Sequence, residues 1–146
     1  MKLINNQNIL LIDEITTLLD THTNISISCD YFTAYALFDM LENFKRVNSI
    51  RILLSYDANK EEDFQFLYSS DEHQLNLQLD RKYRIHQVIN LIKDKVEIRK
   101  GSLANQHVLI VENDGTSTSF NLTPLNFDSV SLGRVSAKSP IFITSF

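Results

Sequence analysis

Residues 25–56 read ISISCDYFTAYALFDMLENFKRVNSIRILLSY and indicate the fold class more clearly than any other stretch. Residues 25–29 alternate β-branched and small side chains, which is typical of a strand. Residues 33–46 place apolar side chains at helical spacing. Residues 50–56 are nearly all apolar, which predicts a strand covered on both faces. A strand, a helix and a buried strand in succession predict a βαβ unit with parallel strands.

The elements predicted on either side extend this unit. A helix is predicted over residues 8–21, and residues 57–95 are predicted to form two helical pieces. Two further strands are separated by Asn113-Asp114-Gly115, a strong turn signal. The remaining ranges are 76–94 for the second helical piece and 96–99, 107–112, 117–122 and 141–144 for strands. We therefore expect an α/β fold with a mixed, largely parallel central sheet flanked by helices.

Composition favours one domain spanning residues 1–146, with 43% hydrophobic and 22% charged residues. The single cysteine excludes an internal disulfide and fits the reducing cytoplasm. No apolar run is long enough for a membrane span, and no signal peptide is evident. The net charge of −4 gives no general support to nucleic-acid binding, although local patches matter more. The final apolar strand predicts that the chain is the N-terminal part of a longer protein.

Residues that suit phosphodiester chemistry flank the predicted turn. Side chains alternate along a strand, so His107 should point the same way as Leu109, and Ser119 the same way as Asn121. We expect His107 and Asn121 on adjacent strands with side chains on the same side, and Asp114 close enough to orient the imidazole. An imidazole can attack phosphorus while hydroxyl and amide donors hold the oxygens.

These residues resemble a known signature. His107-Val108-Leu109 with Asp114 is similar to the phospholipase D motif His-x-Lys-x4-Asp, and residues 119–123 resemble the Gly-Ser-x-Asn-Leu-Thr segment that follows it. Residues 26–33, 49–54 and 96–99 resemble strands of the same group. The chain thus resembles the phospholipase D-like (HKD) superfamily, closest to the N-terminal domains of bacterial superfamily-2 helicases and restriction endonucleases. Leu109 stands where that family has lysine, and Thr118 where it has glycine.

The resemblance implies a phospholipase D-like half, with His107 as a metal-independent nucleophile and Asn121 as a phosphate clamp. It also implies DNA as a partner, a homodimer that joins two motifs, a downstream helicase or nuclease domain, and no cofactor or metal. Leu109 is expected to line this site and to weaken catalysis, so that Leu109→Lys would restore some activity. The basic residues Arg81, Lys82 and Arg84 are candidates for nucleic-acid contact or for a solvated helix face.

The expected function is a nuclease-like, DNA-directed accessory domain that binds nucleic acid or dimerises and cleaves weakly or not at all. One alternative is an active phosphodiesterase in which Lys100, Arg134 or Lys138 replaces the missing lysine. Another is a structural module for protein contacts. His107 can also be a structural histidine, and Asp114 can serve the turn alone.

Overall fold

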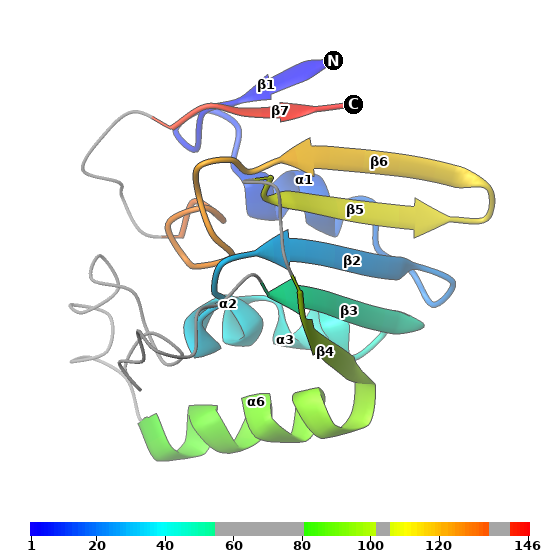
Figure 1. The fold of residues 1–146 in the computed structure, drawn as a ribbon, viewed down its shortest axis with the longest axis vertical. Coiled ribbons are helices and arrows are strands. Elements are labelled where there is room, and N and C mark those ends of the chain that lie inside the picture. Colours follow the sequence, from blue (N-terminus) through cyan, green and yellow to red (C-terminus); the bar gives the residue numbers. More distant parts are fainter. Residues whose placement is uncertain (55–80, 102–105, 135–140) are drawn as a thin grey trace.

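The computed structural model describes residues 1–54, 81–101, 106–134 and 141–146, apart from the side chains of Ala34 and of residues 81–85. The described strands form one sheet in the order β1-β7-β6-β5-β2-β3-β4. Four described helices accompany it (Figure 1). The strands are β1 (Lys2–Ile4), β2 (Asn24–Cys29), β3 (Ser49–Leu54), β4 (Val96–Lys100), β5 (Val108–Asn113), β6 (Thr116–Asn121) and β7 (Ile143–Ser145); the helices are α1 (Leu11–Thr16), α2 (Ala34–Asp39), α3 (Leu41–Phe44) and α6 (Arg81–Lys95).

The sheet is mixed, as predicted, but it is mostly antiparallel. β2 pairs with β3 and β3 with β4 in parallel, which confirms the predicted βαβ unit. The other neighbours, β1–β7, β7–β6, β6–β5 and β5–β2, are all antiparallel. The expectation of a largely parallel sheet is therefore wrong. The β5–β6 hairpin and the pairing of β1 with β7 add antiparallel strands that the βαβ pattern does not reveal.

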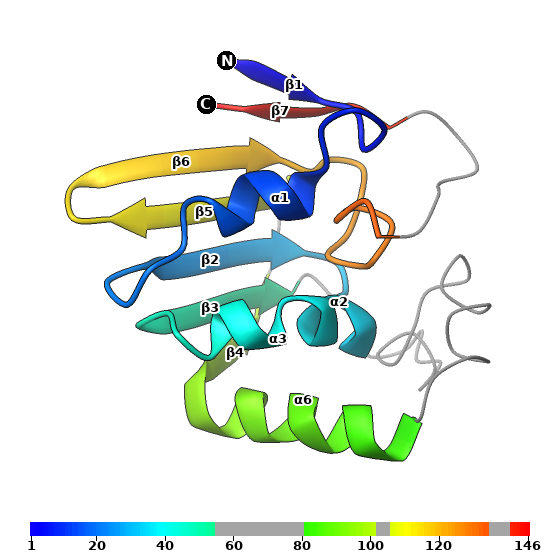
Figure 2. The ribbon, with the colours of Figure 1, turned by 180° about the vertical axis from the view of Figure 1, so that it is seen from behind.

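The described helices cover one face of the sheet. α1, α2 and α3 lie over the face seen in Figure 2, and α6 runs along the edge beside β4, where it packs against α2 and α3. Figure 1 looks onto the other face, on which no helix of the described residues lies. β3 is consequently buried on one face only, with Ile50 and Ile52 inside and Arg51 and Leu53 exposed. The prediction that this strand is covered on both faces is wrong.

The hydrophobic core lies between the sheet and the helices of that covered face. Alternate residues of the central strands enter it, including Ile25, Ile27 and Leu109, each at most 2% exposed. The rings of Phe44 and Phe127 stack with centroids 6.2 Å apart. Full burial of such a side chain stabilises the fold by about 1.5–3 kcal/mol, so strand periodicity decides which face packs.

The first two predicted helices are shorter in the structure. The Asn6 side chain accepts the Leu11 N–H at 2.8 Å, and α1 starts there rather than at residue 8. The Thr16 and Thr17 hydroxyls donate back to the carbonyls of Ile12 and Glu14, where the helix ends. The helix predicted over 33–46 divides into α2 and α3 at Met40. The piece predicted before residue 81 lies outside the described residues. No described helix is long and apolar enough to cross a bilayer.

Candidate functional site

His107 lies at the carboxyl end of β2, one residue before β5. Its N–H donates to the Thr123 hydroxyl at 2.9 Å, and its carbonyl accepts the Leu122 N–H at 2.8 Å. These bonds place it beside the β5–β6 ladder, opposite Leu122. Its side chain therefore points to the helix-covered face, as does that of Leu109, which confirms the predicted alternation. The residue is only 6% exposed.

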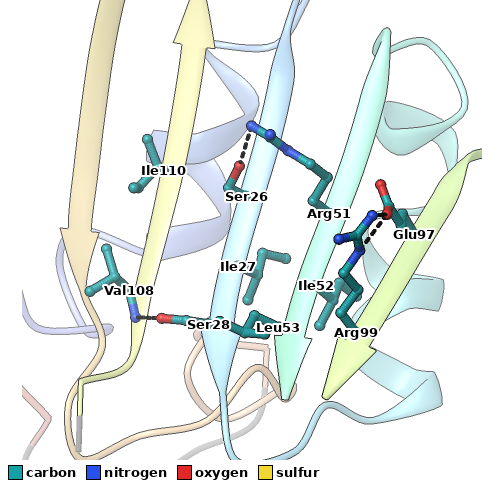
Figure 3. A pocket seen from close by; sticks show the side chains of 10 residues that line it. All are labelled: Ser26, Ile27, Ser28, Arg51, Ile52, Leu53, Glu97, Arg99, Val108 and Ile110. Carbon is teal, nitrogen blue, oxygen red and sulfur yellow. Dashed lines mark hydrogen bonds and ion pairs between the residues drawn. The ribbon is translucent and has the colours of Figure 1, made fainter. Parts of the chain in front are cut away.

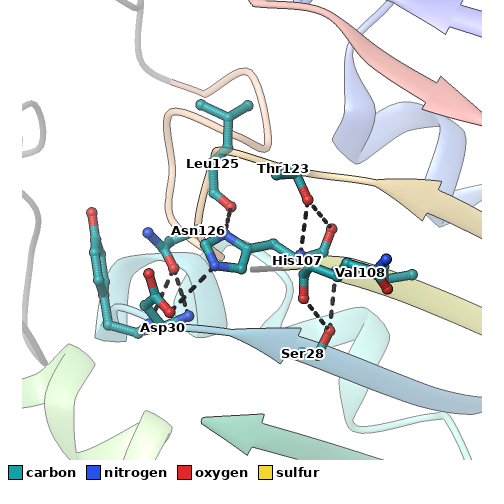
Figure 4. A network of polar contacts seen from close by, with 9 residues as sticks. Ser28, Asp30, His107, Val108, Thr123, Leu125 and Asn126 are labelled. Carbon is teal, nitrogen blue, oxygen red and sulfur yellow. Dashed lines mark hydrogen bonds and ion pairs between the residues drawn. The ribbon is translucent and has the colours of Figure 1, made fainter. Parts of the chain in front are cut away.

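Both nitrogens of the His107 ring face acceptors (Figure 4). Nδ1 lies 2.6 Å from the Leu125 carbonyl oxygen, and Nε2 lies 3.3 Å from Asp30 Oδ1. A carbonyl can only accept, so Nδ1 carries a proton. A doubly protonated ring donates to both acceptors, whereas a neutral ring keeps the Leu125 bond alone. The Asp30 side chain is 57% exposed, so water competes for its carboxylate.

Asn126 extends this network to the backbone of the β2 end. Its Oδ1 accepts the N–H groups of Asp30 at 2.8 Å and Tyr31 at 3.1 Å. The Thr33 N–H donates to the Phe127 carbonyl at 3.1 Å and continues the link. Together these bonds tie the end of β2 to the segment that follows β6. Sequence reasoning missed Asp30 and Asn126, although Asp30 directly follows a predicted strand, where α/β folds often place polar site residues.

Asn121 does not join His107. In the β5–β6 register Val108 pairs with Asn121, so Asn121 shares the uncovered face with Val108. Its Oδ1 accepts the Thr123 N–H at 3.2 Å. Ser119 pairs with Ile110 and lies on the same face as Asn121, as predicted. The prediction that His107 and Asn121 share a side is wrong, because the hairpin register is offset by one residue from the one that the motif requires.

Asp114 lies at the far end of the hairpin from His107. The whole of β5 separates the two residues, so Asp114 cannot orient the imidazole. Asp114 has φ of +24° and Gly115 has φ of +87°, as a two-residue hairpin turn requires. The predicted turn is confirmed, and the turn accounts for Asp114 without a catalytic role. The four predicted catalytic residues do not converge.

Leu109 belongs to the core rather than to a site. It is fully buried and pairs with Ile27 on β2 and Phe120 on β6. Of its proposed substitutes, Lys100 ends β4, and β2 and β3 lie between β4 and β5. Arg134 Nε lies 3.8 Å from Asp39 Oδ1. Lys138 lies outside the described residues.

Positive charge gathers at one edge of the sheet. Residues 41–54 and 81–101 form α3, β3, α6 and β4, and we call these four elements the basic edge. Arg81, Lys82 and Arg84 belong to α6, but their side chains lie outside the described residues. The basic edge carries ten cationic residues and three acidic ones: Lys45, Arg46, Arg51, Arg81, Lys82, Arg84, Lys93, Lys95, Arg99 and Lys100, against Glu42, Asp94 and Glu97.

A hollow of about 420 Å³ lies on the uncovered face of the sheet, over β5, β2, β3 and β4 (Figure 3). Two arginines border it. An Arg51 Nη donates to the Ser26 hydroxyl at 3.0 Å and lies 3.6 Å from a Glu112 oxygen. Arg99 pairs with Glu97 at 2.6 Å. Ser28 accepts the Val108 N–H at 3.2 Å. The hollow thus offers hydroxyls and guanidinium groups beside apolar side chains.

No protein-family model matches the sequence, and no curated protein matches it either. The resemblance to the phospholipase D-like superfamily therefore stays a prediction.

Proposed function

We propose that this chain is a nucleic-acid-binding domain of the phospholipase D-like kind that hydrolyses phosphodiesters weakly or not at all. The basic edge carries the proposal. Ten cations against three acidic residues produce a local positive surplus in a chain whose net charge is −4. Phosphate backbones are attracted to such a patch because binding releases counterions from the nucleic acid.

Several of these cations form ion pairs that are exposed to solvent. Lys45 lies 3.4 Å from Glu42, and the side chains of Arg51 and Arg99 are 58% and 77% exposed. Exposed ion pairs contribute about 0–1 kcal/mol, so a phosphate can replace the carboxylate. Lys95 differs, because its ammonium donates to the carbonyls of Lys45 and Val47 and holds α6 to the end of α3.

Fluorescence anisotropy of a labelled oligonucleotide, measured at several salt concentrations, tests this function. We expect affinity to fall steeply as salt rises, and the slope to flatten when Arg81, Lys82 and Arg84 are replaced together by Gln. Arg99→Gln with Lys100→Gln should act likewise. Lys2→Gln, on the opposite edge, is the matched control and should leave the slope unchanged. Absence of binding in dilute buffer, or binding that ignores salt, would contradict the proposal.

Hydrolysis is a second candidate that one observation favours. The Leu125 carbonyl holds the Nδ1 proton of His107, which leaves Nε2 as the nitrogen available for attack. Against it, Asp30 faces Nε2 and neither Asn121 nor residue 109 supplies a clamp. We therefore expect little hydrolysis of bis-p-nitrophenyl phosphate, with or without chelator. Rapid hydrolysis by the unmutated chain that His107→Ala abolishes would show that the chain is an active phosphodiesterase.

Homodimerisation is a separate proposal. We propose that two copies of the chain pair through β4. β4 ends the sheet in the described chain, and its residues 97–100 are exposed. An antiparallel pairing of two β4 strands centred on Ile98 would set Glu97 opposite Arg99 of a second copy on both sides of the two-fold axis. Opposite charges in directly paired positions stabilise a sheet by roughly 0.2–1 kcal/mol per pair.

Charge exchange tests this interface by sedimentation. Glu97→Arg and Arg99→Glu should each weaken self-association, because each sets like charges opposite one another. Mixing the two variants, or combining both changes in one chain, should restore it. Monomeric wild-type protein at high micromolar concentration, or dimers that ignore all three changes, would rule out this arrangement.

A further inference from the structure

The uncovered face of the sheet, which we call the open face, can be mapped from strand register. Directly paired residues share a face, and the ladder continues past β7 because the Ser119 and Phe146 backbones exchange hydrogen bonds of 3.0 and 2.9 Å. Two rows of side chains therefore cross the open face. One row is Phe146, Ser119, Ile110, Ser26, Arg51 and Glu97; the other is Leu3, Thr144, Asn121, Val108, Ser28, Leu53 and Arg99.

One end of the open face is aromatic. Phe146 is 66% exposed, and its backbone bonds to Ser119 fix the direction of its side chain. Phe142 is 64% exposed and lies between the buried Ile141 and Ile143, so its side chain points away from the core, toward the open face. Leu3 is 54% exposed beside them. Clustered exposed apolar side chains of this size mark an interaction surface.

The other end of the open face is cationic, with Arg51 and Arg99 at the border of the hollow. Between the two ends lie hydroxyl and amide groups, from Ser26, Ser28 and Asn121, and the apolar side chains of Val108 and Ile110. Neighbouring strands lie about 4.8 Å apart, so the four steps from β7 to β3 span roughly 19 Å. That width suits a short run of nucleotides.

We propose that the open face binds single-stranded nucleic acid, an inference that rests on the function proposed above. Bases stack on Phe142 and Phe146, and phosphates reach Arg51 and Arg99, displacing Glu112 and Glu97 from them. Aromatic side chains on a sheet are a common platform for unstacked bases, whereas a duplex keeps its base faces covered. A protein partner fits less well, because polar side chains interrupt the apolar ones in both rows.

The test compares a labelled oligothymidine with its duplex form, in low salt, on the 146-residue chain. We expect the single strand to bind more tightly, and Phe142→Ala and Phe146→Ala each to weaken it about tenfold, within the range of base–aromatic stacking. Phe→Leu at either position should recover only part of the loss, because leucine keeps apolar area but no ring. Ile12→Ala, a partly buried apolar residue of α1 on the covered face, is the control and should leave the affinity unchanged. Thermal melting confirms that each variant is folded.

The outcomes separate the two proposals. If single strand and duplex bind equally, and only the basic-edge variants weaken them, the nucleic-acid function stands and the open-face site is overturned. If neither form binds in dilute buffer, both proposals fail. If the phenylalanine variants abolish self-association and leave oligonucleotide affinity unchanged, the open face is an interface between copies of this chain, and the single-strand site is overturned.

Discussion

The His107 imidazole joins two segments that are distant in sequence, and this accounts for its burial better than catalysis does. Its ring contacts the Leu125 carbonyl and the Asp30 carboxylate, and its backbone meets Thr123 and Leu122. The resemblance to the phospholipase D motif predicted a catalytic role for His107. The position of His107 along its strand predicted the direction of its side chain. Neither could predict its acceptors, because both come from loops that only the folded chain brings together.

His107→Ala should lower the free energy of unfolding by about 1–3 kcal/mol, because it leaves the Leu125 carbonyl without its donor. His107→Asn should cost less, since the asparagine amide can take the place of Nδ1–H. Asp30→Asn should cost less than about 1 kcal/mol, because that carboxylate is largely exposed. Urea unfolding measures all three. A loss no greater for His107→Ala than for Asp30→Asn would contradict this structural role.

Leu109→Lys should unfold the domain rather than restore activity. The side chain is fully buried in the core, so lysine places an unpaired charge there. We expect a loss of at least about 3 kcal/mol, by chemical denaturation. Ile110→Lys, one residue along on the open face, is the matched control and should cost about 1 kcal/mol or less. Similar losses for the two variants would mean that the assigned faces of β5 are wrong.

Cys29 should be inert in the folded protein. Burial raises the pKa of its thiol to about 12, against a value near 9 when exposed. The thiol stays protonated in the fold while the unfolded chain ionises, so stability is lost as pH rises from about 9 toward 12. Between pH 8 and pH 10 the loss should be on the order of 1 kcal/mol relative to Cys29→Ala. Rapid labelling of the native thiol by a disulfide reagent at pH 8 would refute this.

At the scale of elements, prediction succeeded where the pattern is local. The alternation in β2 and the turn residues between β5 and β6 each specify structure within a few residues, and both were predicted correctly. β1 was missed because three residues carry little periodicity and its partner, β7, lies at the other end of the chain. The side of the sheet on which Asn121 lies was predicted wrongly, because a change of one residue in strand register moves every side chain to the other face.

The β5–β6 turn offers a test of this local encoding. Gly115 has φ of +87°, and nothing lies within 4 Å of an added Cβ, so substitution strains the backbone without a clash. Gly115→Ala should cost about 1 kcal/mol, and Gly115→Asn should cost less because asparagine tolerates the left-handed region. Thermal unfolding measures both. Equal stability of the alanine variant would show that the turn does not hold the left-handed conformation.

At the scale of the whole molecule, charge is distributed more unevenly than composition suggests. A net charge of −4 gives no general support to nucleic-acid binding, yet the cations concentrate in α3, β3, α6 and β4. The sequence shows the clustering of charge along the chain. It does not show that α3, β3, α6 and β4 meet at one edge, because that adjacency depends on parallel pairing and on α6 packing against α2 and α3.

This arrangement predicts that oligonucleotide stabilises the folded chain. A ligand that binds only the native state at 100 times its dissociation constant adds about 2.7 kcal/mol, which corresponds to a rise in Tm of roughly 5–10 °C for a domain of this size. The rise should be largest in dilute buffer and should vanish at high salt, where counterion release no longer favours binding. Arg99→Gln with Lys100→Gln should reduce it, and Lys2→Gln should not. A rise that persists in high salt would show that contacts other than the basic edge hold the oligonucleotide.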